Sequence, residues 1–165
     1  MTASTSRPHP SASRASRVAR ALVAGRRAAL PWRLAGAALL LLVSGVHLYL
    51  YAAEEYHFIP TVGPLFMMTA VVAVVLAVAV VTVQRPIVDI VGALFALSVL
   101  GGYLLTLYLP DGLFLFKEPG IYYSGGLSIF AEVGTAVTLL AAAAPSLIEA
   151  WRGTGRAADG DRPAR

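Results

Sequence analysis

Four long apolar runs dominate the sequence, at residues 34–53, 65–83, 87–109 and 127–148. A helix that crosses the hydrocarbon core of a bilayer needs about 20 apolar residues, and each run is close to that length. Formal charge enters the runs only at Asp89, near the start of the third, and at Glu132, inside the fourth. The pattern predicts an all-α integral membrane protein with four transmembrane helices.

Prolines separate the runs at positions that helices tolerate. Pro64 and Pro86 lie where a helix would begin, and Pro110 follows the third run. The connection at residues 84–86 is so short that the second and third helices should be antiparallel neighbours, which predicts an antiparallel four-helix bundle. The longer connection at residues 110–126 contains the apolar residues 113–116 together with Tyr122 and Tyr123, and this composition is typical of a segment at the lipid headgroup level.

Basic residues are distributed very unevenly between the connections. Lys117 lies in the third connection, whereas all twelve arginines lie before the first run, in the second connection or after the fourth run, at Arg7, Arg14, Arg17, Arg20, Arg26, Arg27, Arg33, Arg85, Arg152, Arg156, Arg162 and Arg165. The positive-inside rule therefore places both termini in the cytoplasm. Topology also explains the net charge of +4 better than nucleic-acid binding does, so we expect the bilayer as partner, with other membrane subunits possible and no nucleic acid.

These patterns divide the chain into a disordered basic tail at residues 1–33, a transmembrane domain at 34–151 and a disordered tail at 152–165. The first run is longer than a typical signal core and lacks a good cleavage site, which favours an uncleaved helix over a secretory or twin-arginine signal. The preference for arginine over lysine, with abundant alanine and valine, indicates a bacterial plasma membrane.

The amino-acid composition limits the kinds of chemistry that this chain can perform. The chain is 58% hydrophobic and only 13% charged, unlike an ordinary soluble domain, which carries about 25% charged residues. It has no cysteine, which excludes thiol redox chemistry, iron–sulfur clusters and disulfides. Little of the chain is left to form a soluble catalytic core, so we expect a non-enzymatic protein, and nothing in the sequence requires a cofactor.

Polar side chains within the runs are the candidate functional residues, because such groups are costly in hydrocarbon. At about 1.5 Å per residue, His47 and Glu132 both lie roughly 7–10 Å below the outer boundary. Tyr103 and Thr106 of the third run fall near the same level. We therefore expect a polar layer between three helices. Above it, further candidates line the route outward at Tyr51, Glu54, Glu55 and His57.

Three interpretations of this layer stay open. The first is a structural hydrogen-bond network, the second is a proton-binding or ligand-binding pocket, and the third is a metal or haem site. A haem would need two facing histidines, and His47 is the one histidine inside a run. For a metal, the candidate ligands are His47, His57, Glu54 and Glu55, although no tight ligand motif is present.

One segment resembles a known group. Residues 45–51 (Gly-Val-His-Leu-Tyr-Leu-Tyr) followed by residues 56–66 (Tyr-His-Phe-Ile-Pro-Thr-Val-Gly-Pro-Leu-Phe) resemble a pattern in uncharacterised four-helix integral membrane proteins of actinobacteria. These are similar to the DoxX-like class in helix number, and members of that class have been linked to quinone or thiosulfate redox systems. The resemblance implies a multi-pass plasma-membrane protein. The leading hypothesis is an accessory membrane module, and the alternative is a small proton-coupled transporter or a redox-linked protein.

Overall fold

The computed structural model describes residues 10–160, with side chains described at residues 28–149 and 151–152. It consists of the helices α1 (Pro10–Ala53), α2 (Val62–Thr82), α3 (Pro86–Tyr108) and α4 (Tyr123–Gly160), with a short 3-10 helix, η1 (Tyr56–Phe58), before α2. Each of the four long helices contains a segment long and apolar enough to cross a membrane, at Ala28–Ala53, Val62–Thr82, Pro86–Tyr108 and Tyr123–Glu149. The predictions of an all-α chain and of four such helices are confirmed.

The bounds of α2 and α3 lie close to the predicted runs, and local chemistry explains them. Arg85 has extended backbone angles and Pro86 occupies the first turn of α3, where its missing N–H costs no hydrogen bond. Leu109 is extended, as expected for a residue that precedes proline.

The helix α1 begins 24 residues before the predicted run, at Pro10 rather than at residue 34. It therefore includes residues 10–33 of the predicted basic tail and contains Pro31 within its length. The segment is rich in alanine and arginine, both strong helix formers, which accounts for the extension. At the other end of the chain, α4 continues to Gly160. Residues 1–9 and 161–165 of the two predicted tails lie outside the described residues.

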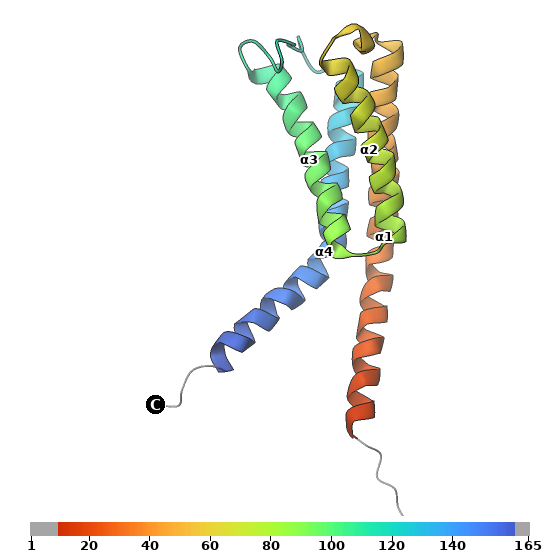
Figure 1. Ribbon diagram of the computed structural model, residues 1–165, viewed down its shortest axis with the longest axis vertical. Helices are drawn as coiled ribbons and strands as arrows, with labels where there is room; N and C mark the ends of the chain where they lie inside the picture. The colour runs from red at the N-terminus through yellow and green to blue at the C-terminus, as the bar shows by residue number, and fades with distance from the viewer. Residues whose placement is uncertain (1–9, 161–165) are drawn as a thin grey trace, which may run out of the picture.

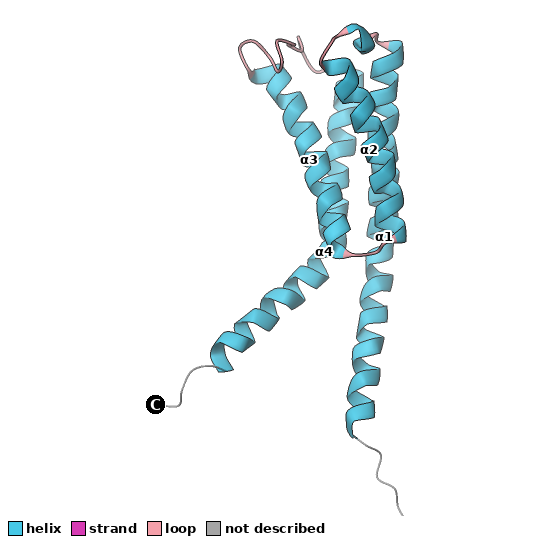
Figure 2. Ribbon diagram, in the orientation of Figure 1, coloured by secondary structure: helices cyan, strands magenta, loops and turns pink. Residues whose placement is uncertain are grey.

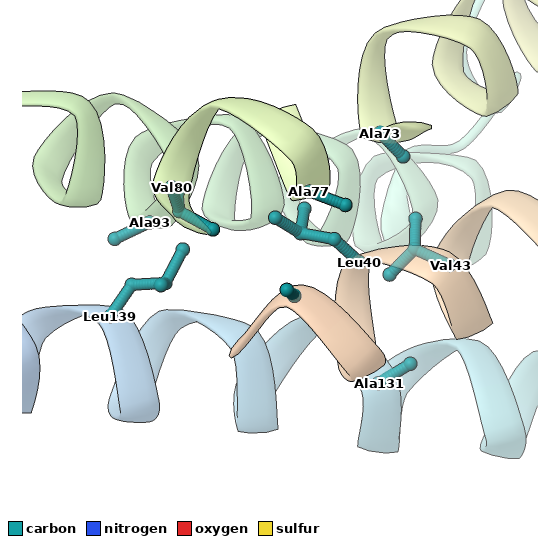
Figure 3. Close-up of a cluster of buried hydrophobic side chains, with 9 residues drawn as sticks. Leu40, Val43, Ala73, Ala77, Val80, Ala93, Ala131 and Leu139 are labelled. Atoms are coloured by element: carbon teal, nitrogen blue, oxygen red, sulfur yellow. The ribbon is translucent and has the colours of Figure 1, made fainter. Parts of the chain in front are cut away.

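All four helices contribute to the buried apolar core. Small side chains make up much of it, so the helix backbones approach closely. Figure 3 shows the labelled side chains directed toward one another from the four helices. The cluster comprises Ala37, Leu40, Val43, Ala73, Ala77, Val80, Ala93, Ala131 and Leu139.

One leucine of α4 fills a space made by two glycines. A Cβ atom added at Gly92 of α3 would lie 2.6 Å from Cδ1 of Leu139, and one added at Gly36 of α1 would collide with the same side chain. Leu139 is completely buried. The two glycines therefore allow α1 and α3 to pack against the same point on α4.

The helices do not contact one another equally. Extensive contacts join α1 to α2, α1 to α4 and α3 to α4, whereas α2 and α3 touch along little of their length. Figure 1 shows α3 leaning away from α2 above the short turn that connects them. Apart from this turn, the loops gather at the opposite end, as Figure 2 shows. We call the end with η1 and residues 109–122 the loop end, and the end with residues 83–85 the turn end.

Candidate functional site

Glu132 is the most deeply buried acid in the loop-end half of the molecule. It lies on α4 and has no exposed surface. The hydroxyl of Ser128, one helical turn earlier, donates a 2.8 Å hydrogen bond to Oε1 of Glu132. The other carboxyl oxygen, Oε2, is buried and has no hydrogen-bond partner among the described residues. An acidic group in this position has one oxygen that can bind a proton or accept a hydrogen bond from a water molecule.

Tyr103 of α3 presents a second buried polar atom without a partner, its hydroxyl oxygen. The ring reaches α4 at Gly125, where an added Cβ would collide with the Tyr103 hydroxyl. Gly125 is three residues before Ser128, so the hydroxyl lies about one helical turn from the Ser128–Glu132 pair. The sequence placed Tyr103 and Glu132 at one level, and the structure puts them on two helices in extensive contact.

His47 of α1 has different neighbours. It is buried, and its Nδ1 donates a 2.9 Å hydrogen bond to the carbonyl oxygen of Val43. Its ring packs edge-on against Phe66 of α2, with the ring centroids 5.2 Å apart. Phe66 in turn stacks on Tyr56 of η1 at 5.0 Å. Within the described part of the chain, no hydrogen bond joins His47 to Glu132.

Thr106, the remaining polar candidate of the layer, bonds to its own helix, and so does a threonine of α4. The hydroxyl of Thr106 donates to the carbonyl oxygen of Tyr103 at 2.7 Å. On α4, Thr135 donates to Ala131 at 2.7 Å. Such bonds satisfy a hydroxyl in hydrocarbon without a second helix.

The candidates above the layer lie at the loop end and are largely exposed. His57 is exposed, and its Nδ1 donates to the carbonyl oxygen of Tyr51 at 2.8 Å. Glu54 and Glu55 are also exposed, and Glu55 has a left-handed backbone with φ of 62°. Among the described residues, no three His, Asp or Glu side chains form a group that could hold a metal ion. The four candidate ligands are therefore not brought together as a coordination set.

Sequence reasoning missed a contact between the two loops at the loop end. The hydroxyl of Tyr56 donates to the carboxylate of Glu118, at 2.9 Å to Oε1 and 3.3 Å to Oε2. Burial raises the pKa of Glu118 above its ordinary value, while the bond from Tyr56 acts in the opposite direction. Burial, followed by the bond to Glu118, likewise raises the pKa of Tyr56. The two residues are 62 positions apart, and no pattern in the sequence links Tyr56 to Glu118, so the sequence offered no signal for this contact.

Sequence reasoning also missed a buried ion pair near the turn end. Arg33 of α1, assigned above to the basic tail, donates from Nε to both carboxylate oxygens of Asp89, at 3.0 and 3.1 Å, and from Nη2 to Oδ2 at 2.8 Å. Both side chains are buried, and Nη1 of Arg33 has no hydrogen-bond partner in the part of the chain that the structure describes. A signal was present, because Asp89 is the one acid of the third run and Arg33 directly precedes the first run.

Comparison with known proteins identifies no relative of this chain. Neither the protein family models nor the curated proteins nor the solved structures include a match to this chain. The resemblance to uncharacterised four-helix membrane proteins of actinobacteria, which are DoxX-like in helix number, therefore stays a prediction. What the structure identifies is a chain with the four apolar helices of a multi-pass membrane protein.

Proposed function

We propose that this chain is a non-enzymatic membrane module, an accessory subunit whose helices serve as contact surfaces within the bilayer. The observation that carries the proposal is the bonding of the polar side chains inside the helices. Nδ1 of His47 and the hydroxyls of Thr106 and Thr135 each donate to a carbonyl oxygen of their own helix, so these groups have hydrogen-bond partners without a substrate. The proposed arrangement is an antiparallel four-helix bundle in a bacterial plasma membrane, with both termini cytoplasmic.

The outward surfaces of α2 and α3 support a role in lateral contact. A smaller share of these two helices is buried inside the chain than of α1 and α4. Their exposed side chains are almost all apolar, and α2 and α3 also touch each other little. Examples are Val75 and Val78 of α2 and Leu94 of α3. In a membrane such faces meet either lipid or the helices of another subunit.

Photo-crosslinking tests the proposed contact surfaces. A photoreactive amino acid at Val75 or Leu94, introduced one at a time in cells of the source organism, should give a discrete adduct with another membrane protein. The same residue at Ala73, which is fully buried, is the matched control and should crosslink only within the chain. Adducts with lipid alone from every outward position would refute the accessory role.

Reporter fusions test the proposed orientation. Fusions after Gln84 and Arg165 should report a cytoplasmic location, and fusions after Ala53 and Gly120 an external one. The expectation rests on the distribution of arginines. A cytoplasmic signal from the fusion after Ala53 or after Gly120 would overturn the orientation.

A second candidate function is favoured by one observation, the two unpartnered polar atoms near Glu132. Oε2 of Glu132 and the Tyr103 hydroxyl are both buried on neighbouring helices, and a proton or a water molecule there would satisfy them. Glu132 would then be the proton-binding group of a proton-coupled transporter.

Proteoliposomes separate the two functions. A proton-conducting protein should dissipate an imposed pH gradient, and Glu132→Gln, which preserves shape and removes the charge, should abolish that flux. Ser98→Ala is the matched control, because Ser98 is exposed and donates to the carbonyl oxygen of Phe95 on its own helix. For an accessory module we expect no flux above that of empty vesicles. Flux that is lost in Glu132→Gln and kept in Ser98→Ala would replace the accessory role with transport.

A further inference from the structure

The connection between α3 and α4 contains a very tight hairpin. Leu113 and Phe116 exchange two backbone hydrogen bonds of 2.9 Å each. The two residues between them, Phe114 and Leu115, both have left-handed backbone angles, with φ of 55° and 64°. Two left-handed corner residues in a two-residue loop are the signature of a type I′ turn. We call residues 113–116 the hairpin and Phe114 and Leu115 its tip.

The residues at the tip are unusual for this turn. Type I′ corners favour asparagine and glycine, because a side chain with a Cβ is crowded in the left-handed region. Here the corners hold two large apolar residues, and neither side chain is buried by the protein. Leu115 is 90% exposed and Phe114 is 59% exposed. The turn therefore displays two apolar side chains outward in spite of their unfavourable backbone geometry.

The base of the hairpin is firmly held. Gly112 has φ of 71°, and a Cβ at that position would collide with the carbonyl of Phe116. Lys117 donates from Nζ to the carbonyl oxygens of Leu109 and Pro110, at 3.1 Å each. The ring of Phe116 packs edge-to-face against the ring of Tyr56, with the ring centroids 5.7 Å apart. Since the base is fixed, the direction of the tip is fixed as well.

The position of the hairpin indicates what the tip meets. The tip follows the end of α3 by only six residues, and Figure 1 shows this connection curling outward from the end of α3, on the side away from α1 and α2. Exposed tyrosines occur at the same end, at Tyr108, Tyr122 and Tyr123. Tyrosine gathers where a bilayer meets water.

We propose that the Phe114–Leu115 tip inserts into the boundary between the headgroups and the acyl chains of the adjacent leaflet and anchors the loop end of α3. Two side chains are far too small for a stable protein interface, which buries about 800 Å² on each partner. A lipid surface needs no such area, because the spanning helices already hold the tip beside it. The proposal rests on the assignment of these helices to a membrane.

Fluorescence quenching tests the depth of the tip. The chain has no cysteine, so Leu115→Cys offers a single site for an environment-sensitive nitrobenzoxadiazole label. In vesicles of phosphatidylcholine and phosphatidylglycerol we expect a blue-shifted emission that spin-labelled lipids quench and aqueous iodide does not. The matched control is Asp111→Cys, an exposed polar position of the same loop, whose label iodide should quench at least threefold more strongly. Equal quenching of both labels by iodide would overturn the proposal.

A third label separates this proposal from the membrane assignment itself. Val75→Cys on the exposed face of α2 should be quenched by the spin-labelled lipids if the helices span the bilayer. Failure at Val75 removes the membrane assignment and the hairpin proposal with it. Quenching at Val75 without quenching at Leu115 removes the hairpin proposal alone.

A variant that keeps the turn tests the anchoring role. Phe114→Asn with Leu115→Gly supplies the residues that a type I′ turn prefers, so the hairpin should still form. A spin label at Tyr108→Cys, at the end of α3, should become at least twofold more mobile in this variant than with the natural tip. Unchanged mobility of the label at Tyr108 would show that the tip anchors nothing.

Discussion

The buried ion pair between Arg33 and Asp89 leads to a sharp prediction, because breaking it leaves a charge without compensation. Asp89→Ala removes the three hydrogen bonds that Arg33 donates to the carboxylate, at 2.8 to 3.1 Å. Removal of one partner from a buried pair typically costs about 3–5 kcal/mol. Arg33 directly precedes the apolar run at residues 34–53, so in this variant its flexible side chain can extend partly toward water. We therefore expect the free energy of unfolding to fall by about 3 kcal/mol, the lower end of this range.

The assay is reversible unfolding in mixed micelles, with helix content followed by circular dichroism as the fraction of denaturing detergent rises. Arg85→Met is the matched control, because Arg85 is an exposed arginine in the α2–α3 turn and its replacement should change stability by less than about 0.5 kcal/mol. The double variant Arg33→Met with Asp89→Leu removes both charges and fills their space. It should recover most of the loss, since apolar replacements of a buried pair are often neutral or stabilising.

Two results would refute this reasoning. If the free energy of unfolding of Asp89→Ala falls by less than about 1 kcal/mol, Arg33 reaches water or another acceptor without an energetic penalty. A double variant as unstable as Asp89→Ala would mean that the position needs the shape of the natural side chains rather than compensation of their charges.

Three further predictions concern packing and pH. Gly92→Ala should lower the free energy of unfolding by about 1–3 kcal/mol, because the new methyl group meets the fully buried Leu139. Gly101→Ala on the same helix is the control and should not lower it, since a Cβ there has nothing within 4 Å. Thermal unfolding in detergent measures both variants, and equal melting temperatures would contradict the close packing at Gly92. Burial raises the pKa of Glu118, so between its unfolded and folded pKa values the folded chain holds a proton that the unfolded chain has released, and stability should fall as pH rises through that window. Tyr56→Phe removes a bond to the ionised form and should move the titration midpoint of Glu118, followed by its infrared carboxylate band, to higher pH; a midpoint that moves to lower pH would contradict the assigned bond.

The helices could be predicted from sequence because each spanning segment is a long apolar run with little or no charge. Pro86 and Pro110 also bracket α3 to within one or two residues of its observed bounds. The start of α1 was harder to predict. Its alanine and arginine residues suit a helix and a charged tail equally well, and Pro31 lies within the helix.

The candidate site was less predictable, since depth along a helix says nothing about which way a side chain points. Counting residues predicts that His47 and Glu132 share a level, but rotation about the helix axis decides which neighbours each side chain meets. Helix α1 directs His47 toward Phe66 of α2, while Glu132 bonds to Ser128 on its own helix. The Tyr56–Glu118 bond depends on how two loops fold over each other, and no periodic pattern encodes that.

The insertion of Leu139 between Gly36 and Gly92 has a consequence for the order in which the chain is made. The first three helices leave the ribosome before α4, and at that stage the space beside the two glycines is empty. Helix α3 then lacks its main partner, because it touches α2 along little of its length. Its extensive contacts are with α4, which is synthesised last of the four helices. Stable docking of α3 therefore has to wait for α4, and nascent chains that stop before Tyr123 should expose α3 to membrane proteases.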